Sequence, residues 1–390
     1  MREEQPYDTA QIKVFEGAEA VRRRPGMYLG STSARGLHTM LLSVVEHLMN
    51  EAAAEGDRAV RVTLTADGGV RVEDDGPGIP FGSPPESGGA VGGGSGLEER
   101  LTRFVLPEKP LGRSRVQTWG GDGMILVIAN ALSVCLTAEV RRAGLRRVQK
   151  FARGVALAPP SSAGPAERTG TTLAFRPDPA VFEAVVPSFA VLDGRLAELA
   201  FLYPGLDVTL TDERPGGGPA VRRYRSPDGV RGLVASLVPA RAAFPAEYVL
   251  SFTREGPAGV LDVALAWAGE GPGQVLGFAN GMPTGHGGTH LEGFRDGLTA
   301  AVTAYTSAYG PMSPQDPGAG ADLLERGLVA VVSVKLDAPA FEGATRTRLA
   351  GDDVRAFTAE AVREELLAWL EAGPGRAGRL LGRVTGAAPS

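Results

Sequence analysis

Residues 59–80, AVRVTLTADGGVRVEDDGPGIP, restrict the possible folds more than any other stretch of the chain. Apolar and polar residues alternate on both sides of an Asp-Gly-Gly sequence at 67–69, a pattern that predicts two antiparallel strands joined by a tight turn. The second strand ends at Asp74, and the glycines at 76 and 78 allow the backbone to turn sharply. We therefore expect a hairpin that delivers a carboxylate to a loop able to approach a flat ligand.

Further patterns predict helices and strands on both sides of this hairpin. Residues 37–54, LHTMLLSVVEHLMNEAAA, have apolar side chains at helical spacing and predict a buried helix with one polar stripe. Another buried helix is expected at 124–133 and another strand at 169–177. In the second half, strands are expected at 262–269 and 327–339 and a closing helix at 354–373.

The chain is long enough for two domains. It has 390 residues, of which 43% are hydrophobic, and the Gly/Pro-rich patch at 213–229 is the best candidate for a boundary. We place the domains at residues 1–220 and 221–390, both of the α+β class with helices on one face of a mixed sheet.

Composition excludes several classes of protein. The only cysteine, Cys135, cannot form an internal disulfide; it is expected to be a small buried hydrophobe in a reducing cytoplasm. Four histidines at scattered positions show no zinc-ligand spacing. No apolar stretch reaches the roughly 20 residues that a membrane helix needs. The net charge of −5 argues against nucleic-acid binding over the whole surface, and the basic runs at 22–24 and 141–150 are interpreted as solvated faces.

Two motifs could carry chemistry. The Asp74 carboxylate could accept a hydrogen bond from an exocyclic amine, although Asp-x-Gly-x-Gly is also common in turns. The sequence WGGDGMILVIANALS at 119–133 places a glycine-rich loop before a helix, where backbone N–H groups suit phosphates. A tight connection capped by Asp122 would explain the same residues.

Taken together and in this order, the motifs resemble a known family. The matching phrases are YDTAQIKVFEGAEAVRRRPGMYLGST at 7–32, VEDDGPGIP, NALS, RTGTTLAF, GGTHLEGFRDGLT and GLVAVVSVKLDAPAF. They are similar to the ATPase and transducer region of DNA gyrase B and topoisomerase IV, in the GHKL superfamily. The resemblance implies a GHKL (Bergerat-type) α/β sandwich followed by a ribosomal-protein-S5-like transducer domain. It covers the chain from about residue 7 to the last helix, without the DNA-cleaving portion of the family.

The resemblance also implies a nucleotide site. Asp74 matches the aspartate that reads adenine, Thr171 matches the threonine that supports it, and Pro77 stands where an arginine is usual. In the phosphate lid, Asp122 replaces a histidine and Ile125 replaces the last glycine. The positions that keep the family pattern of nucleotide binding are Asp74, Gly76, Gly78, Ile79, Pro80, Gly120, Gly121, Gly123 and Thr171.

The catalytic positions depart from the family. Its glutamate base and its asparagine ligand of Mg²⁺ correspond to Ser43 and His47, and Thr39 replaces the histidine that orients the base. A serine hydroxyl cannot act as a general base without a strong base beside it, and imidazole is a poor ligand for Mg²⁺. Glu46 and Glu51 are the carboxylates near enough to be considered as substitutes. The preferred interpretation is that Ser43 and His47 are polar residues packed in a pocket that no longer catalyses.

The second domain is expected to contribute one cation. Where the family presents a glutamine and a lysine to the terminal phosphate, the chain has Ala344, Thr345 and Arg346. Arg346 could bind phosphate, or it could reflect the general scarcity of lysine in this sequence. His38 and His290 fall in family phrases and are expected to be structural.

These observations lead to one preferred function and two alternatives. The preferred function is a gyrase B-like module that binds ATP and hydrolyses it poorly; whether Mg²⁺ is needed stays open. The module is expected to form a homodimer through an N-terminal arm that contains Tyr7 and Ile12. The alternatives are an active ATPase subunit of a type II topoisomerase and a structural protein whose pocket is dead. We expect a cytoplasmic protein with a possible topoisomerase subunit as partner, while DNA contact stays open.

Overall fold

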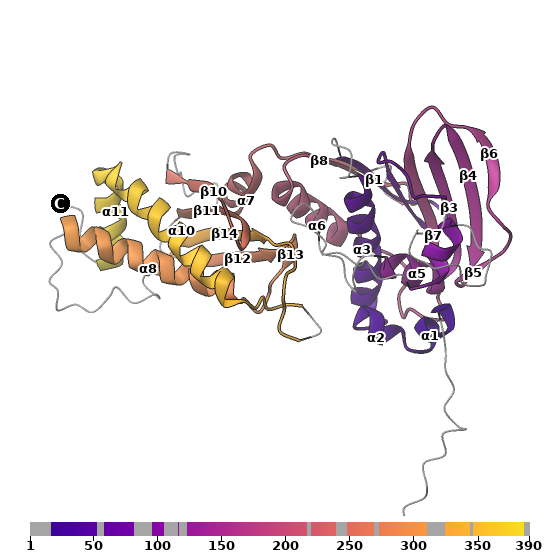
Figure 1. Cartoon of the computed structure of the whole chain (residues 1–390), viewed down its shortest axis with the longest axis horizontal. Helices are drawn as coiled ribbons and strands as arrows, with labels where there is room; N and C mark the ends of the chain where they lie inside the picture. The colour runs from indigo at the N-terminus through magenta and orange to yellow at the C-terminus, as the bar shows by residue number, and fades with distance from the viewer. Residues whose placement is uncertain are drawn as a thin grey trace, which may run out of the picture.

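A computed structural model describes residues 17–52, 58–81, 96–104, 116, 123–216, 220–238, 248–268, 273–309, 324–343 and 346–385. They form an elongated molecule with two β-sheets, one toward each end, and helices packed on the sheets (Figure 1). The fold is therefore α+β, as the sequence predicts.

The first sheet has nine strands in the order β5-β4-β3-β7-β2-β1-β8-β9, and β6 also pairs with β4. Neighbouring strands are antiparallel except for β1 and β8, which are parallel. The strands are β1 (Arg58–Leu64), β2 (Val70–Asp74), β3 (Ser133–Arg142), β4 (Leu145–Ala152), β5 (Val155–Ala156), β6 (Ser161–Pro165), β7 (Gly170–Pro177), β8 (Leu206–Asp212) and β9 (Ala220–Tyr224).

The expected hairpin is confirmed as β1 and β2. Val60 pairs with Asp74 and Leu64 pairs with Val70, so the turn lies at the Asp-Gly-Gly sequence. The Asp67 side chain accepts hydrogen bonds from the Thr65 hydroxyl and the Gly69 N–H, which stabilise this turn. The register places Asp74 at the end of a central strand, beside β7 on one side and β1 on the other.

Helices cover the first sheet and bury its apolar face. The predicted helix at 37–54 is α3, which begins at Ala34, and the predicted helix at 124–133 is α5. Apolar residues of α3, such as Val44 and Leu48, are fully buried with residues of the sheet in one core. The helices of this part are α1 (Gly17–Arg23), α2 (Pro25–Leu29), α3 (Ala34–Ala52), α4 (Gly96–Thr102), α5 (Met124–Ala131) and α6 (Phe189–Leu202).

The second sheet has five strands in the order β10-β11-β14-β12-β13, with β12 and β14 parallel. Its strands are β10 (Leu250–Gly256), β11 (Gly259–Trp267), β12 (Gln274–Ala279), β13 (Met282–Pro283) and β14 (Leu328–Lys335). Helix α7 (Gly229–Leu237) packs on β11 and β14. Ala264, Ala266 and Val331 of these strands share one hydrophobic core with residues of the first sheet. The long helices α8 (Thr289–Tyr309) and α10 (Asp352–Glu371) belong to a second core.

Helices α8 and α10 pack closely because glycines face the contact. A Cβ atom on Gly297 would lie 2.6 Å from the Ala359 carbonyl oxygen, and one on Gly293 would overlap the Arg355 carbonyl oxygen. The chain closes with α11 (Pro374–Thr385), a helix that the sequence patterns did not indicate. The observed strands β11 and β14 and helix α10 confirm the other elements expected in this half.

The domain division at residue 220 stays a prediction. Strand β9, which begins at Ala220, pairs with β8 as the last strand of the first sheet. The first sheet thus continues to Tyr224, and the helix that packs on the second sheet begins at Gly229.

Cys135 corrects one expectation, because it is exposed rather than buried. It lies on β3 next to a register shift between Ser133 and Cys135, and its neighbour Leu136 is buried in the core. Since side chains on a strand alternate between faces, Cys135 points away from the core.

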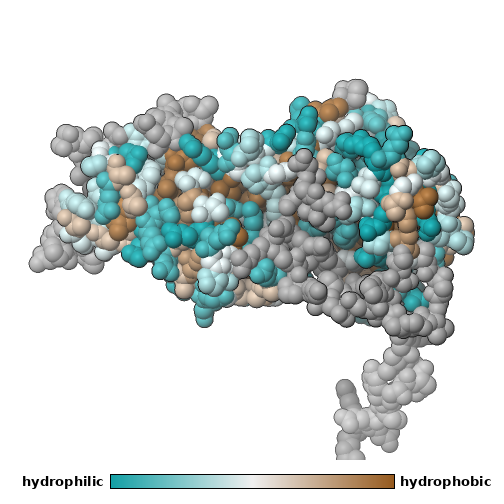
Figure 2. All heavy atoms as spheres, turned by 45° about the horizontal axis from the view of Figure 1, so that its top comes forward, coloured by the Kyte–Doolittle hydropathy of each residue, from teal (hydrophilic) through white to brown (hydrophobic). Residues whose placement is uncertain are grey.

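The surface mixes residue types. Figure 2 shows hydrophilic residues over much of this face, with smaller hydrophobic areas between them. Among the described residues, no helix has both the length and the apolar character needed to span a membrane.

Candidate nucleotide-binding site

Asp74 is the centre of the predicted site, and its side chain is held by backbone groups. The Gly76 N–H donates to Oδ1 at 2.8 Å, and the Thr171 N–H donates to Oδ2 at 3.3 Å. The side chain is fully buried. Burial raises the pKa of the Asp74 carboxyl to about 7, opposed by these two N–H donors and reinforced by the charge of Glu51. The result is an oriented acceptor whose charge depends on pH near neutrality.

The loop after Asp74 requires glycine at two positions. A Cβ on Gly76 would lie 2.7 Å from the Ala52 Cα at the end of α3. Gly78 has a φ of +76°, and its Cβ would lie 2.7 Å from the Arg141 carbonyl oxygen. The loop therefore runs in direct backbone contact with both α3 and β3.

Thr171 supports this loop in two ways. Its backbone N–H meets Asp74, while its hydroxyl accepts a hydrogen bond from the Ile79 N–H at 3.2 Å. The hydroxyl thus fixes the loop, and the backbone fixes the carboxylate. Ile79 is buried beside them, and Pro80 is partly exposed.

Sequence reasoning missed Arg142. Its Nη1 donates to the Gly78 carbonyl oxygen at 2.7 Å and to the Pro77 carbonyl oxygen at 3.3 Å. A cation is therefore present at this loop although Pro77 replaces an arginine. The interpretation of 141–150 as a solvated face is wrong for its first residues, because Arg141 is mostly buried and forms ion pairs with Glu73 and Glu139. Only the pairing of β3 with β7 could have indicated this.

The polar stripe of α3 contains Ser43 and His47, one helical turn apart. Both are buried, with 2% and 5% of their surface exposed. Neither is a carboxylate, so neither offers the base that activates water in the related ATPases.

Glu46 forms a buried ion pair with Arg195. Its Oε1 accepts hydrogen bonds from Arg195 Nη2 at 2.8 Å and from Arg195 Nε at 3.2 Å. Burial raises the pKa of Glu46, and the attraction of Arg195 opposes that rise. A carboxylate tied to a guanidinium in this way is poorly placed to take a proton from water at Ser43.

The residues present do not fit the Mg²⁺ site of the family. Asn50 could offer an amide oxygen, but that oxygen accepts from the Val116 N–H at 2.8 Å, and its NH₂ donates to the Val116 carbonyl at 2.9 Å. Glu46 is paired with Arg195, and His47 is an imidazole. Within the described ranges no group of three or more His, Cys, Asp or Glu side chains could hold a metal ion.

The remaining predicted residues are placed only in part. Gly123 has a φ of +85° and precedes α5, while Ile125 is fully buried in that helix. Arg346 has a φ of +53°, and its partial burial lowers its pKa. Its contact with phosphate stays a prediction. Six predicted residues lie outside the described part of the chain, namely Tyr7, Ile12, Gly120, Gly121, Ala344 and Thr345, and so does Asp122.

Two histidines have structural roles, as expected. His38 Nε2 accepts a hydrogen bond from the Ser188 N–H at 2.8 Å. His290 is fully buried, its Nε2 lies 3.1 Å from the Thr284 hydroxyl, and burial lowers its pKa to about 4. It is therefore neutral at physiological pH.

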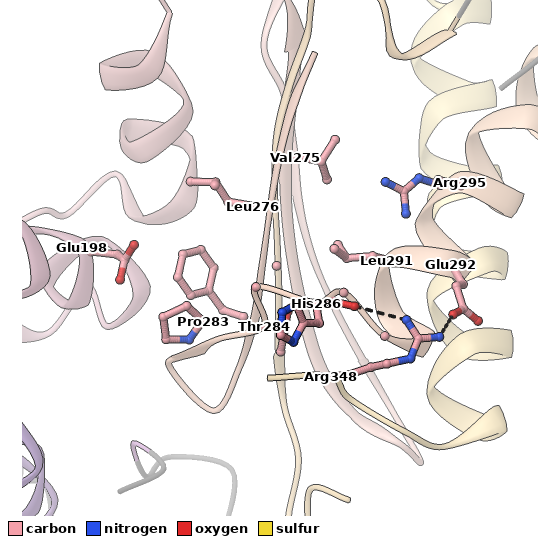
Figure 3. Close-up of a pocket in the computed structure, with 15 residues that line it drawn as sticks. Glu198, Val275, Leu276, Pro283, Thr284, His286, Leu291, Glu292, Arg295 and Arg348 are labelled. Carbon is pink, nitrogen blue, oxygen red and sulfur yellow. Dashed lines mark hydrogen bonds and ion pairs between the residues drawn. The ribbon is translucent and has the colours of Figure 1, made fainter. Parts of the chain in front are cut away.

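A cavity of about 540 Å³ lies away from the predicted nucleotide residues. Figure 3 shows Glu198 of α6 and Pro283 on one side of the strand that crosses it, and Arg295 and Glu292 of α8 on the other. Arg348 pairs with Glu292 and donates to the His286 carbonyl oxygen at 3.2 Å. No predicted nucleotide residue lines this cavity.

Comparison with known proteins identifies the family. The DNA gyrase B protein of Streptomyces coelicolor is 35% identical over 392 residues, which cover 96% of this chain and 56% of that protein. The chain belongs to the DNA gyrase B family. The family model for DNA gyrase B matches residues 229–390. The chain spans little more than half the length of the curated gyrase B relatives it matches.

Solved structures show which part of gyrase B the chain resembles. The 43K ATPase domain of Thermus thermophilus gyrase B, solved with an aminocoumarin, aligns with a TM-score of 0.78 and 29% identity, covering 96% of this chain and 95% of that chain. The ATP-binding domain of topoisomerase IV from Francisella tularensis, in complex with a small-molecule inhibitor, aligns with a TM-score of 0.75 and 25% identity, covering 96% and 98%. The resemblance inferred from sequence phrases is confirmed, and the fold is consistent with the GHKL class.

Proposed function

We propose that this gyrase B-like chain binds ATP and uses it to control dimerisation, while its hydrolysis of ATP is impaired. The oriented, buried carboxylate of Asp74 carries the proposal for binding. Ser43 in place of a carboxylate base carries the proposal for impaired turnover.

Adenine binding is supported by the shape and chemistry of the loop. Asp74 can accept a hydrogen bond from the N6 amine, because each carboxylate oxygen has capacity beyond its one backbone partner. Gly76 and Gly78 bring the backbone close to α3 and β3, and Ile79 supplies an apolar side chain to the loop. Two solved structures similar to this chain are described as an ATPase domain and an ATP-binding domain.

Impaired hydrolysis is supported by the commitments of the α3 side chains. Glu46 pairs with Arg195 and Asn50 with the Val116 backbone, so one candidate for the missing base and one for the missing metal ligand are engaged. General base catalysis contributes about 10²–10⁴-fold to such reactions, so turnover should be slow even if ATP is bound in a productive pose.

In this proposal, ATP binding causes two copies of the chain to close into a dimer. The arm containing Tyr7 and Ile12 would cross onto a second copy of the chain, and Arg346 would contact the terminal phosphate from the second domain. A DNA-cleaving topoisomerase subunit is the proposed partner class, since the curated relatives are components of DNA gyrase.

The deciding experiment is a calorimetric titration with ATP, with and without Mg²⁺, followed by phosphate release on the same sample. We expect binding that depends little on Mg²⁺, with phosphate release near the background rate. Binding together with Mg²⁺-dependent turnover would show that another group replaces the missing base. Absence of binding would overturn the nucleotide part of the proposal and favour a purely structural role.

A further inference from the structure

Arg195 joins three parts of the molecule through one guanidinium group. It lies on α6, and its side chain is only 11% exposed. Nη2 donates to Glu46 on α3 and also to the Gly281 carbonyl oxygen, both at 2.8 Å, while Nη1 donates to Glu198 at 2.5 Å. Gly281 belongs to the turn between β12 and β13, so this contact crosses from the first domain to the second.

The turn that receives Arg195 is tightly seated against the first domain. Asn280 and Gly281 have φ values of +47° and +77°, as in the two-residue turns that Asn-Gly favours. A Cβ on Gly281 would lie 2.9 Å from the Tyr203 ring and 3.2 Å from a Val116 methyl group. The tip of the turn therefore has no room to shift toward the first domain.

The same turn is fixed to the loop that carries Arg346. The Asn280 side chain accepts from the Leu336 N–H and donates to the Leu336 carbonyl oxygen, both at 2.8 Å. Leu336 follows β14 directly and begins the segment that leads to Arg346. Asn280 is fully buried, so a movement of the turn would move the start of this segment with it.

On the first-domain side, the contact begins at α3. Glu46 and Asn50 are one turn apart, on a stripe adjacent to that of Ser43 and His47. Glu46 forms an ion pair with Arg195. Asn50 forms hydrogen bonds with the Val116 backbone, and the Val116 side chain lies against Gly281. The stripe of Glu46 and Asn50 therefore contacts the Gly281 turn of the second domain, through Arg195 and through Val116.

We propose that Arg195 is a positioning residue that holds the Asn280–Gly281 turn against α3, so that the orientation of the second domain follows the position of the nucleotide-site helix. The inference rests on the proposed function in one respect: it assumes that nucleotide binding moves α3. The restraint itself exists without nucleotide and can be measured without it.

The test measures the distance between two spin labels in the whole chain. Cys135 is the only cysteine, is exposed and lies on the first sheet. An S251C substitution adds a second label on β10 of the second sheet, where Ser251 is exposed. We expect a narrow distance distribution in this labelled protein and the loss of the narrow peak after Arg195→Gln.

Two further variants make the result specific. Arg195→Gln leaves Glu46 buried without its partner and could destabilise the fold, so Glu46→Gln/Arg195→Gln removes both charges together. The matched control is Arg223→Gln, which breaks a two-hydrogen-bond ion pair with Asp207 inside the first sheet. We expect broadening in the double variant and none in the control. An unchanged distribution in the folded double variant would overturn the proposal.

Measurements with nucleotide then distinguish this inference from the proposed function. With a nonhydrolysable ATP analogue, the distance in the S251C protein should shift, whereas the double variant in the same background should bind the analogue and lose the shift. A double variant that keeps the shift would overturn the coupling. If calorimetry detects no binding to the wild type, the proposed function fails, while the distributions without nucleotide still decide whether Arg195 restrains the domains.

Discussion

At the scale of single residues, the candidate site combines a buried, oriented carboxylate, which we propose accepts from adenine, with a serine where a catalytic base is expected. Asp74 is oriented by two N–H donors, and Ser43 and His47 are buried on α3 at the positions where a base and a metal ligand are expected. Both features are local, so each can be tested by a substitution that leaves the fold in place.

Restoring both missing groups should restore turnover. In Ser43→Glu/His47→Asn we expect ATP-dependent phosphate release to rise by about 10²-fold or more, because a base and an amide ligand return to adjacent turns of α3. The measurement is a coupled phosphate assay. The matched control is Ser43→Gln/His47→Asn, which has the same size without the base and should stay inactive. Equal activity in the two variants would refute the role assigned to position 43.

Adenine binding should depend on pH through Asp74. Its pKa of about 7 means that the ionised acceptor is the minor form at pH 6 and the major form at pH 8. If only that form binds, the affinity should be about tenfold lower at pH 6 than at pH 8, measured by calorimetry without Mg²⁺.

Asp74→Asn is the control for this titration. We expect the affinity for ATP to fall by about tenfold or more, since a hydrogen bond to a charged acceptor is lost. Between pH 6 and pH 8 the affinity of this variant should change only as far as titration of the nucleotide's own phosphates changes it. The folded-state pKa lies above the ordinary value, so Asp74 favours folding at low pH and this contribution disappears as the pH rises through about 7. The Asp74→Asn variant should fold at pH 8, because asparagine carries no charge that burial would penalise. An unaltered pH profile would assign the titration to another group.

At the scale of elements, close contacts at glycines set how helices and loops meet. Gly76 lets the loop after β2 touch α3, and Gly293 and Gly297 let α8 approach α10. By contrast, a Cβ atom added to Gly194 on α6 would meet nothing within 4 Å in the described part of the chain.

These two kinds of glycine should respond oppositely to alanine. Gly293→Ala should destabilise the protein by about 1–3 kcal/mol, because a Cβ would overlap the backbone of α10. Gly194→Ala should stabilise it by up to about 1 kcal/mol through helix propensity. Chemical denaturation of both variants provides the measurement, and a loss of stability in both would show that helix packing is not the cause.

At the scale of the whole molecule, the parts built on the two sheets are joined by buried side chains as well as by the chain itself. The Tyr203 ring of the first domain lies 5.3 Å from the Lys335 ammonium group of the second, and apolar residues of both sheets share one core. The Arg195 contact lies at the same junction. A ligand that moves α3 is therefore expected to change how the second domain is presented to a partner chain.

Dimerisation is the whole-molecule prediction. A saturating nonhydrolysable ATP analogue should double the mass observed by sedimentation, because the proposed closure brings two arms together. A variant lacking residues 1–16 should bind the analogue and stay monomeric, and Asp74→Asn should dimerise only at higher analogue concentration. Sedimentation that the analogue leaves unchanged, at a concentration shown to saturate binding, would contradict nucleotide-driven closure.

Local patterns were sufficient for several elements and for the family, while the nucleotide site stays a prediction. Alternation around the Asp-Gly-Gly turn predicted β1 and β2, helical spacing predicted α3, α5 and α10, and the order of the motifs indicated the gyrase B family. These features depend on residues close together in the chain, where periodicity and turn chemistry act directly. The exposed Cys135 was missed, since its orientation depends on strand register rather than on its apolar neighbours.

The partners of charged side chains were decided by tertiary structure. Arg142 reaches the loop at Gly78, 64 residues away, and Arg195 reaches Glu46, 149 residues away. No local pattern distinguishes these arginines from solvated ones, because each gains its partner only when strands and helices from distant parts of the chain pack together. The sequence therefore contains the Asp74 loop and its glycines as a motif, whereas the pairing of Glu46 with Arg195 and the contact of Arg195 with Gly281 exist only in the folded chain.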